Sequence, residues 1–208
     1  MSPPETAPPL FDAGAGLRAR RLALADAPLL QRFIAANPEY WQRVGDADPQ
    51  PDEAEQELRS RPPPELSYRE HLDLGFWRED MDAAPELIGF AIVDTDLALA
   101  GCWHIALFIV ATRLHGQGLA RRLYQGLEDW ARAGGAQWLR LGVVQGNAPA
   151  ERFWQRQGFV ELRRRDGIAA GTRLNTVRVL LKPLGVQGVA DYLAQVARDR
   201  PEDGVAPA

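Results

Sequence analysis

A strand-like segment that leads into a glycine-rich turn carries the clearest chemical signal in this sequence. The apolar run 108–110 continues through Arg113 to Gly116 and Gly118, where a helix is predicted to begin. Glycine allows close backbone approach, and the first amides of a helix have no internal partners and attract anions. The turn therefore predicts a cradle for a pyrophosphate, although a tight turn that needs glycine only for its geometry would look the same.

Two classes of ligand would fit such a cradle. The first is a dinucleotide such as NADH, bound by a G-x-G-x-x-G turn. Here Arg121 stands at the third glycine position, and the acidic residue expected on the following strand is missing from 137–147. Both departures disfavour a nicotinamide-dependent reductase. The second class is coenzyme A.

A second motif supports coenzyme A. The segment 147–159 reads Asn-Ala-Pro-Ala-Glu-Arg-Phe-Trp-Gln-Arg-Gln-Gly-Phe, with Asn147 opening a short helix and Gly158 closing it. Together, Arg113-x-x-Gly116-x-Gly118 and this segment resemble the two cofactor motifs of the GNAT superfamily of N-acetyltransferases. The resemblance covers roughly 17–183, and two motifs in the family's order are more specific than one.

The resemblance implies a donor, acetyl-CoA, and a set of residues that bind it. The strand 104–110 would diverge from the strand 137–144, and the pantetheine arm would lie in the gap. Backbone groups near Phe108 and Val110 would polarise the thioester carbonyl, the amides of 115–120 would hold the pyrophosphate, and Asn147 would bond the pantetheine. The implied cofactor-binding residues are Phe108, Ile109, Val110, Arg113, His115, Gly116, Gln117, Gly118, Leu119, Ala120, Asn147, Phe153 and Trp154.

Trp154 departs from the family pattern. Many members carry at this position a tyrosine that protonates the departing thiolate, and an indole N–H is no ordinary acid. Either the thiolate leaves unassisted or another group, such as Tyr40, Tyr68 or Tyr124, supplies the proton. Packing beside the cofactor is the simpler interpretation of Trp154. The missing tyrosine also keeps open a non-catalytic acyl-CoA-binding or sensing module.

His104 is the candidate catalytic base that would take a proton from the acceptor amine. It lies on the same predicted strand as Phe108 and Val110 and at even spacing from both, so we expect all three to share one face. The ordinary pKa of histidine suits base catalysis near neutral pH. A half-buried histidine bonded to a neighbour is the competing interpretation. We expect His115 in the loop of the cradle and His71 at the surface or lining a pocket.

The segment 38–86 is strongly acidic, with 14 acidic and 5 basic residues. The resemblance to the GNAT superfamily implies that this segment forms the wall of the acceptor site. Its field favours a cationic acceptor such as a polyamine, although a solvated acidic face would have the same composition. The reaction we expect is acetyl transfer from acetyl-CoA to a primary amine, small molecule or peptide, by direct attack on the thioester. Cys102 has no visible base beside it, which disfavours a covalent step.

These motifs need a sheet to position them. Hydrophobic periodicity predicts helices at 27–36, 51–60, 117–133, 148–157 and 188–198, and strands at 17–24, 70–77, 87–94, 102–111, 137–144, 159–164 and 174–181. The fold class is α+β: a mixed, mostly antiparallel seven-stranded sheet with helices on both faces. The strands on either side of helix 117–133 form the one central parallel pair.

Composition excludes several other classes of function. A net charge of −4 disfavours nucleic-acid binding. The single lysine precedes a proline, so it cannot complete a phosphate-binding loop. One cysteine and three scattered histidines predict no metal site. No apolar run is long enough to cross a membrane, so we expect a cytoplasmic protein. We expect a disordered extension at 1–16, an acetyltransferase domain at 17–183 and a C-terminal helix and tail at 184–208. The oligomeric state is left open, a homodimer included.

Overall fold

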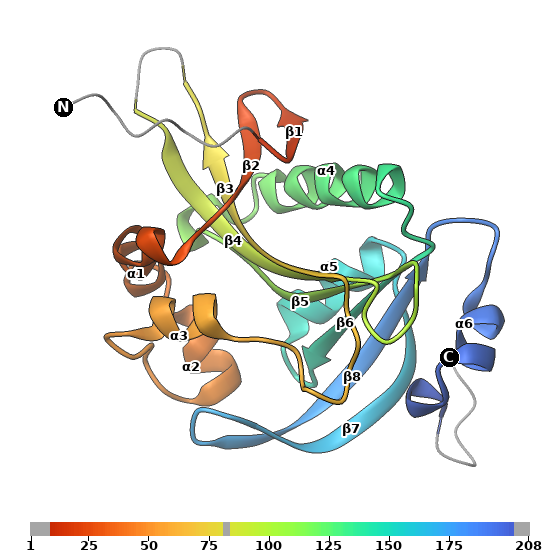
Figure 1. Ribbon diagram of the computed structural model, residues 1–208. Helices are drawn as coiled ribbons and strands as arrows, with labels where there is room; N and C mark the ends of the chain where they lie inside the picture. The colour runs from red at the N-terminus through yellow and green to blue at the C-terminus, as the bar shows by residue number, and fades with distance from the viewer. Residues whose placement is uncertain (1–8, 81–83, 202–208) are drawn as a thin grey trace.

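One mixed sheet organises the chain. The computed structural model describes residues 9–80 and 84–201, and the strands lie in the order β1-β2-β3-β4-β5-β6-β8-β7 (Figure 1). All neighbouring strands are antiparallel except the central pair β5–β6. The strands are β1 Phe11–Gly14, β2 Leu17–Arg21, β3 Glu70–Arg78, β4 Glu86–Thr95, β5 Cys102–Val110, β6 Trp138–Val144, β7 Val160–Ala170 and β8 Arg173–Pro183. The predicted fold class is confirmed, with eight strands instead of seven.

The additional strand is β1. Residues 1–16 were expected to be disordered, yet Phe11–Gly14 pairs with β2 and closes one edge of the sheet. The ring of Phe11 packs against Phe76 and Trp130, with centroid distances of 6.3 and 5.5 Å. Burial of this ring outweighs the proline- and glycine-rich composition around it. Residues 1–8 of the expected extension lie outside the described part of the chain.

The helices match the predicted positions, with one that the periodicity did not indicate. They are α1 Ala27–Ala35, α2 Glu39–Gly45, α3 Glu53–Arg59, α4 Leu119–Ala133, α5 Ala148–Arg156 and α6 Val189–Gln195. The unexpected helix is α2, which follows Pro38 after a break at Asn37. In Figure 1, α1, α2 and α3 gather beside the N-terminal half of the sheet, and α6 lies at the opposite end.

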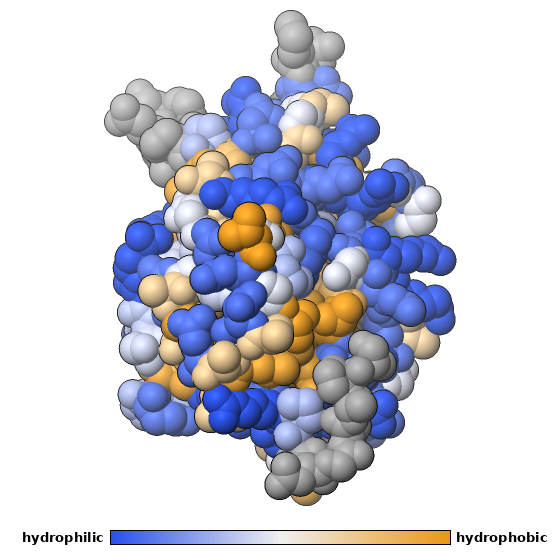
Figure 2. All heavy atoms as spheres, turned by 90° about the vertical axis from the view of Figure 1, so that its right-hand side faces the viewer, coloured by the Kyte–Doolittle hydropathy of each residue, from blue (hydrophilic) through white to orange (hydrophobic). Residues whose placement is uncertain are grey.

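Helices cover both faces of the sheet because successive strand residues point in opposite directions. On β6, Leu139 belongs to the large hydrophobic core that includes residues of α1, α3, α4 and α5. Its neighbour Trp138 belongs to a smaller cluster with Cys102, Leu181 and Tyr192 of α6. The segment after Pro183 therefore packs onto the sheet. Figure 2 shows the face that carries α6, which is mainly hydrophilic and has an apolar area in its lower half.

The central parallel pair separates partway along its length. Residues Cys102–Ile105 of β5 pair with Trp138–Leu141 of β6. Beyond these residues β5 continues to Val110 and β6 to Val144, but the two strands no longer pair with each other. On the other side of β5, the register with β4 shifts because Val93 faces Ile105 whereas Ile92 faces Leu107. Such a bulge bends a strand and increases its twist. The bend turns the end of β5 away from β6.

Candidate active site

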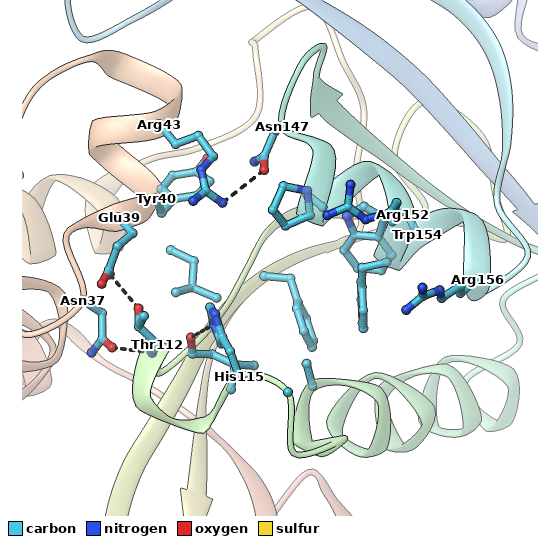
Figure 3. A pocket seen from close by; sticks show the side chains of 18 residues that line it. Asn37, Glu39, Tyr40, Arg43, Thr112, His115, Asn147, Arg152, Trp154 and Arg156 are labelled. Carbon is cyan, nitrogen blue, oxygen red and sulfur yellow. Dashed lines mark hydrogen bonds between the residues drawn. The ribbon is translucent and has the colours of Figure 1, made fainter.

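A cavity of about 410 Å³ opens where β5 and β6 separate (Figure 3). Its walls come from the end of β5, the turn before α4, helix α5 and helix α2. Among the residues predicted to bind the cofactor, those that line it are Phe108, Ile109, Val110, His115, Gly116, Ala120, Asn147, Phe153 and Trp154. The structure thus brings together most of the residues of the two motifs, which are far apart in sequence.

The backbone of β5 presents hydrogen-bonding groups to this cavity. Ala111 N–H donates to Ile88 O of β4 at 2.9 Å, so the preceding residue must direct its N–H and C=O to the opposite side. The Val110 carbonyl does so and accepts a bond from His115 Nε2 at 2.9 Å. By the same alternation, the groups of Phe108 face the side that β6 has left. Unpaired strand groups of this kind can bind an extended amide chain.

Aromatic side chains form the floor of the cavity. The Phe108 ring lies 6.1 Å from Phe153 in a stacked arrangement and 5.7 Å from Trp154. Trp154 also packs against Tyr124 and Phe159 at 5.4 and 5.3 Å, and only 7% of its surface is exposed. Trp154 therefore acts mainly as a packed wall, which fits the simpler of the two interpretations from sequence.

The rim of the cavity is positively charged. Arg152 and Arg156 lie one turn apart on α5 and line the cavity, and Arg43 reaches across from α2 (Figure 3). Arg43 donates to the side-chain oxygen of Asn147 at 3.5 Å, so α2 and α5 meet over the opening. Three guanidinium groups around one opening favour an anionic guest such as a phosphate.

The glycine-rich turn has the geometry expected of a cradle. Gly116 and Gly118 have φ values of +78° and +75°, and no atom lies within 4 Å of the position that a Cβ would take. A side chain there would be strained and would extend into open space. Of the two, Gly116 lines the cavity, and Gly118 caps α4.

Arg113 is not among the residues that line the cavity. It forms an ion pair with Glu86 at the start of β4, and its carbonyl accepts a bond from Gln117 at 3.2 Å. Gln117, Gly118 and Leu119 also stay outside the cavity lining. The expected contribution of the Arg113 side chain thus stays a prediction: a carboxylate 27 residues earlier in the sequence pairs with it, and sequence spacing alone does not show this.

The loop after β5 is fixed to the helices beside it. Thr112 N–H donates to Asn37 Oδ1 at 2.8 Å, and the Thr112 hydroxyl donates to Glu39 at 2.6 Å. The hydrogen bond from Thr112 is the main reason why the pKa of Glu39 is lowered. Glu39 is therefore ionised, and its negative charge offsets only part of the positive charge of the three arginines that line the same opening.

A second cavity of about 320 Å³ adjoins the first, with Tyr40 lining both. Of the three tyrosines considered from sequence, Tyr40 alone reaches either of these cavities. Tyr124 is buried beneath Trp154, and Tyr68 lies on the surface. The pKa of Tyr40 is raised by burial and by the nearby carboxylates Glu57 and Glu53, so its hydroxyl remains protonated.

His104 lines the second cavity and not the first. The bulge on β5 interrupts the alternation, so even spacing does not place His104 beside Phe108. Its Nδ1 lies 3.1 Å from the carbonyl of Arg140 and 3.2 Å from the guanidinium of that residue. Burial and the positive charge of Arg140 lower the pKa of His104 to about 3. A group with so little proton affinity is a weak base near neutral pH, and the expectation of a catalytic His104 is not supported.

The second cavity contains a carboxylate that sequence reasoning missed. Glu57 lies on α3, and within residues 9–80 and 84–201 its side chain has no hydrogen-bond or ion-pair partner. Burial, followed by the charges of Glu53 and Asp73, raises the pKa of Glu57 to about 7. A carboxyl group with this pKa can exchange protons near neutrality. Its only sequence signal is its position in the acidic segment, where it is one acid among many.

His71 forms a buried cluster with two aspartates at the back of this cavity. Its Nδ1 is 2.6 Å from Asp94, and its Nε2 lies 3.7 Å from Asp73. Burial opposes the charged imidazole, but the two aspartates outweigh burial and raise the pKa of His71 to about 9. His71 is thus a cation at neutral pH and compensates the charge of Asp94.

Comparison with known families identifies the chain. The family model described as "Acetyltransferase (GNAT) family" matches residues 32–159. This span includes α2, α3, β5 and α5, which contribute residues to the two cavities. The chain belongs to the GNAT acetyltransferase family. A search of the curated proteins finds no match.

Solved structures share this fold at low sequence identity. An acetyltransferase from Thermus thermophilus is 22% identical, with a TM-score of 0.62 over 81% of this chain and 97% of that one. An acetyltransferase from Salmonella typhimurium that modifies the N-terminal serine of a ribosomal protein is 14% identical, with a TM-score of 0.63 over 84% and 98%. Spermidine N-acetyltransferase from Vibrio cholerae, in complex with CoA and spermine, is 19% identical, with a TM-score of 0.60 over 82% and 96%.

The described residues contain neither a helix long and apolar enough to span a membrane nor a cluster of three or more candidate metal ligands.

Proposed function

We propose that this protein transfers an acetyl group from acetyl-CoA to a primary amine by direct attack of the amine on the thioester. The observation that carries the proposal is the first cavity, in which outward-facing backbone groups of Phe108 and Val110 meet an arginine rim and a glycine cradle. These features fit the parts of coenzyme A: an amide-rich arm, an apolar thioester end and phosphates. The CoA complex of a structural neighbour supports the same choice.

Each part of the site has a role in this proposal. The backbone amides at 115–120 would bind the pyrophosphate, with Arg152 and Arg156 adding charge from α5. Asn147, held by Arg43, would bond the pantetheine arm. The N–H of Val110 faces the opening and would stabilise the negative charge that develops on the thioester oxygen.

Glu57 is the base that we propose for the acceptor amine. The carboxyl group lies in the adjoining cavity, and its pKa of about 7 matches the task of accepting a proton near neutrality. Tyr40 lines both cavities and is the group that we propose to donate a hydrogen bond to the departing sulfur. This assignment replaces the tyrosine that the family often carries at the Trp154 position.

A non-catalytic acyl-CoA-binding module is the second candidate. The observation that favours it is Trp154 itself, since the packed indole cannot protonate a thiolate. The two candidates differ in turnover: a binding module would bind acetyl-CoA without releasing free thiol when amines are supplied.

Thermal unfolding with saturating acetyl-CoA, free CoA and NADH in parallel tests the binding step. A ligand at about 100 times its Kd adds about 2.7 kcal/mol, which raises the Tm of a chain of this size by roughly 5–10 °C. We expect a shift with acetyl-CoA and CoA and none with NADH. A shift with NADH alone would overturn the proposal. Release of free thiol with an amine panel then separates the enzyme from the binding module.

The remaining expectations stay predictions. These are the cytoplasmic location, the absence of a nucleic-acid or membrane partner, and an oligomeric state left open between a monomer and a homodimer. Size-exclusion chromatography with light scattering would measure the oligomeric state directly.

A further inference from the structure

The charge inside the second cavity differs from that of the segment that forms much of its wall. The segment 38–86 is acidic, and the acidity predicted a cationic acceptor. Inside the cavity, however, the lining includes four arginines and two carboxylates: Arg61, Arg140, Arg165, Arg198, Glu57 and Asp94. Most acidic side chains of the segment therefore lie outside the cavity.

Ion pairs with neighbouring side chains neutralise some of these charges. Asp94, at 2.6 Å from the protonated His71, shares that cation with Asp73 at 3.7 Å, which is not among the residues that line this cavity. Arg140 is compensated by Asp199, which accepts bonds from its Nε at 2.6 Å and its Nη2 at 3.0 Å. Glu57 is the one lining carboxylate that remains without a cationic partner among the described residues.

Three lining arginines have no carboxylate partner within residues 9–80 and 84–201. Arg61 donates to the backbone carbonyls of Leu58 and Ser60. The guanidinium groups of Arg165 on β7 and Arg198 after α6 make no ion pair there. They are half-buried, so leaving them uncompensated has an electrostatic cost. The cavity thus has an excess of positive charge.

Arg165 and Arg198 lie close to each other and to Arg140. Burial, together with the like charges of Arg198 and Arg140, lowers the pKa of Arg165. Like charges that converge on a cavity from β6, β7 and the segment after α6 are the arrangement by which proteins bind carboxylates and phosphates.

The negative charge of Glu57 lies on the side of the second cavity that adjoins the first. Glu57 acts electrostatically on Tyr40, the residue shared by the two cavities. An amine next to Glu57 and Tyr40 would therefore lie toward the thioester, and an anionic group would lie toward Arg165 and Arg198.

We propose that the acceptor is an amine that also carries an oxyanion, a carboxylate or a phosphate, bound by Arg165 and Arg198. The proposal rests on the acetyltransferase function proposed above and refines its acceptor. It replaces a polyamine, whose several positive charges the unpaired arginines would repel, with an amino acid or an amine phosphate.

A matched panel of acceptors tests the proposal. Free-thiol release is measured with acetyl-CoA and four kinds of amine: amino acids, the corresponding amino acid amides, aminoalkyl phosphates and spermidine. We expect kcat/KM for acids or phosphates to exceed that of the neutral amides by about tenfold or more. The carboxylate and phosphate arms distinguish the two oxyanions. Rates for both acids and phosphates that do not exceed those of the amides, or a preference for spermidine, would overturn the proposal.

Variants connect the preference to the two arginines. Arg165→Gln and Arg198→Gln should each lower kcat/KM for the oxyanion-bearing amine about tenfold, leave the amides unaffected and leave the Kd of acetyl-CoA unchanged. The control is Arg164→Gln, because exposed Arg164 pairs with Glu161 on the same strand and does not line the cavity. Loss of rate for acids and amides alike would contradict recognition of the oxyanion.

Binding without turnover keeps this proposal separate from the proposed function. Inorganic phosphate and glutarate are titrated into the full chain with and without saturating CoA, and binding is followed by thermal unfolding. Anion binding in the first cavity is recognised by its competition with CoA and is set aside. We expect stabilisation of the wild type that is lost in the Arg165→Gln and Arg198→Gln variants but not in Arg164→Gln. If no amine is acetylated, the proposed function fails while this titration still decides the oxyanion site. No phosphate or glutarate binding, or binding that both variants retain, would overturn it.

Discussion

The two cavities on either side of the β5 bulge obtain their charge in different ways. The first is surrounded by arginines on helices and by backbone amides, whose charge does not change between pH 5 and 9. The second contains Glu57 and His71, whose pKa values are raised to about 7 and about 9. The difference separates two tasks, since a cofactor needs constant attraction whereas an acceptor amine must lose a proton. Added salt should weaken anion binding in both cavities, whereas pH should act mainly on the second, which contains Glu57 and His71.

The largest expected effect concerns the stability that His71 contributes. Its pKa is raised from 6.5 to about 9 in the fold, so the contribution is fully present below pH 6.5 and is lost as pH rises through 9. The shift corresponds to roughly 3 kcal/mol. Urea unfolding at pH 6 and pH 9.5 should show that His71→Gln costs more at pH 6 by about this amount. An equal cost at both pH values would show that the two aspartates do not hold a charged His71.

The next largest effect is expected at Glu57. Glu57→Gln keeps the size of the side chain but removes the base, and should lower kcat about 100-fold. In the wild type, kcat/KM should rise with pH through about 7 as the carboxyl group loses its proton. The steady-state pH profile measures both. If Glu57→Gln retained the wild-type profile, another group would be the base, and His104→Ala under the same conditions would test the histidine.

A smaller effect is expected in the first cavity. Arg152→Gln and Arg156→Gln should each raise the KM for acetyl-CoA about tenfold with little change in kcat, because each removes a charged contact to a phosphate. The wild-type KM should also rise with added salt. Arg113→Gln is the matched control, since Arg113 pairs with Glu86 outside the cavity. A KM for Arg113→Gln that rises as much would place Arg113 in the site after all.

The smallest effect is expected at Trp154. Trp154→Tyr restores the tyrosine that many family members carry, yet we expect a change in turnover of less than about threefold, since Tyr40 reaches the cavity and Trp154 is packed. Single-turnover thiol release measures the chemical step. A large gain would show that the acid limits the rate and that Tyr40 does not supply it.

The sequence predicted the first cavity better than the second for a physical reason. The glycine-rich turn and the segment opened by Asn147 are short, continuous motifs, so the residues of each are brought together by local structure. The second cavity combines Glu57 of α3 with Arg165 of β7 and Arg198, which only the complete sheet brings near one another. No local spacing signals such a meeting.

Two departures from the predictions have identifiable structural causes. The bulge that moves His104 away from Phe108 adds one residue to β5 opposite β4, and the apolar run 102–110 gives no sign of it. The strand β1 depends on the contact of Phe11 with Phe76 and Trp130, which lie far away in the sequence. The periodic helices and strands were predicted well because each shows its buried face in its own residues.

The ion pair between Arg140 and Asp199 has a consequence for the order in which the protein folds. Asp199 is completely buried, and it lies 59 residues after the arginine that it compensates. During synthesis, β6 emerges with Arg140 well before its counter-ion exists, so burial of that strand end is costly until the later segment arrives. The large hydrophobic core can form first, whereas the charge pattern next to His104 is completed only when the segment around Asp199 docks.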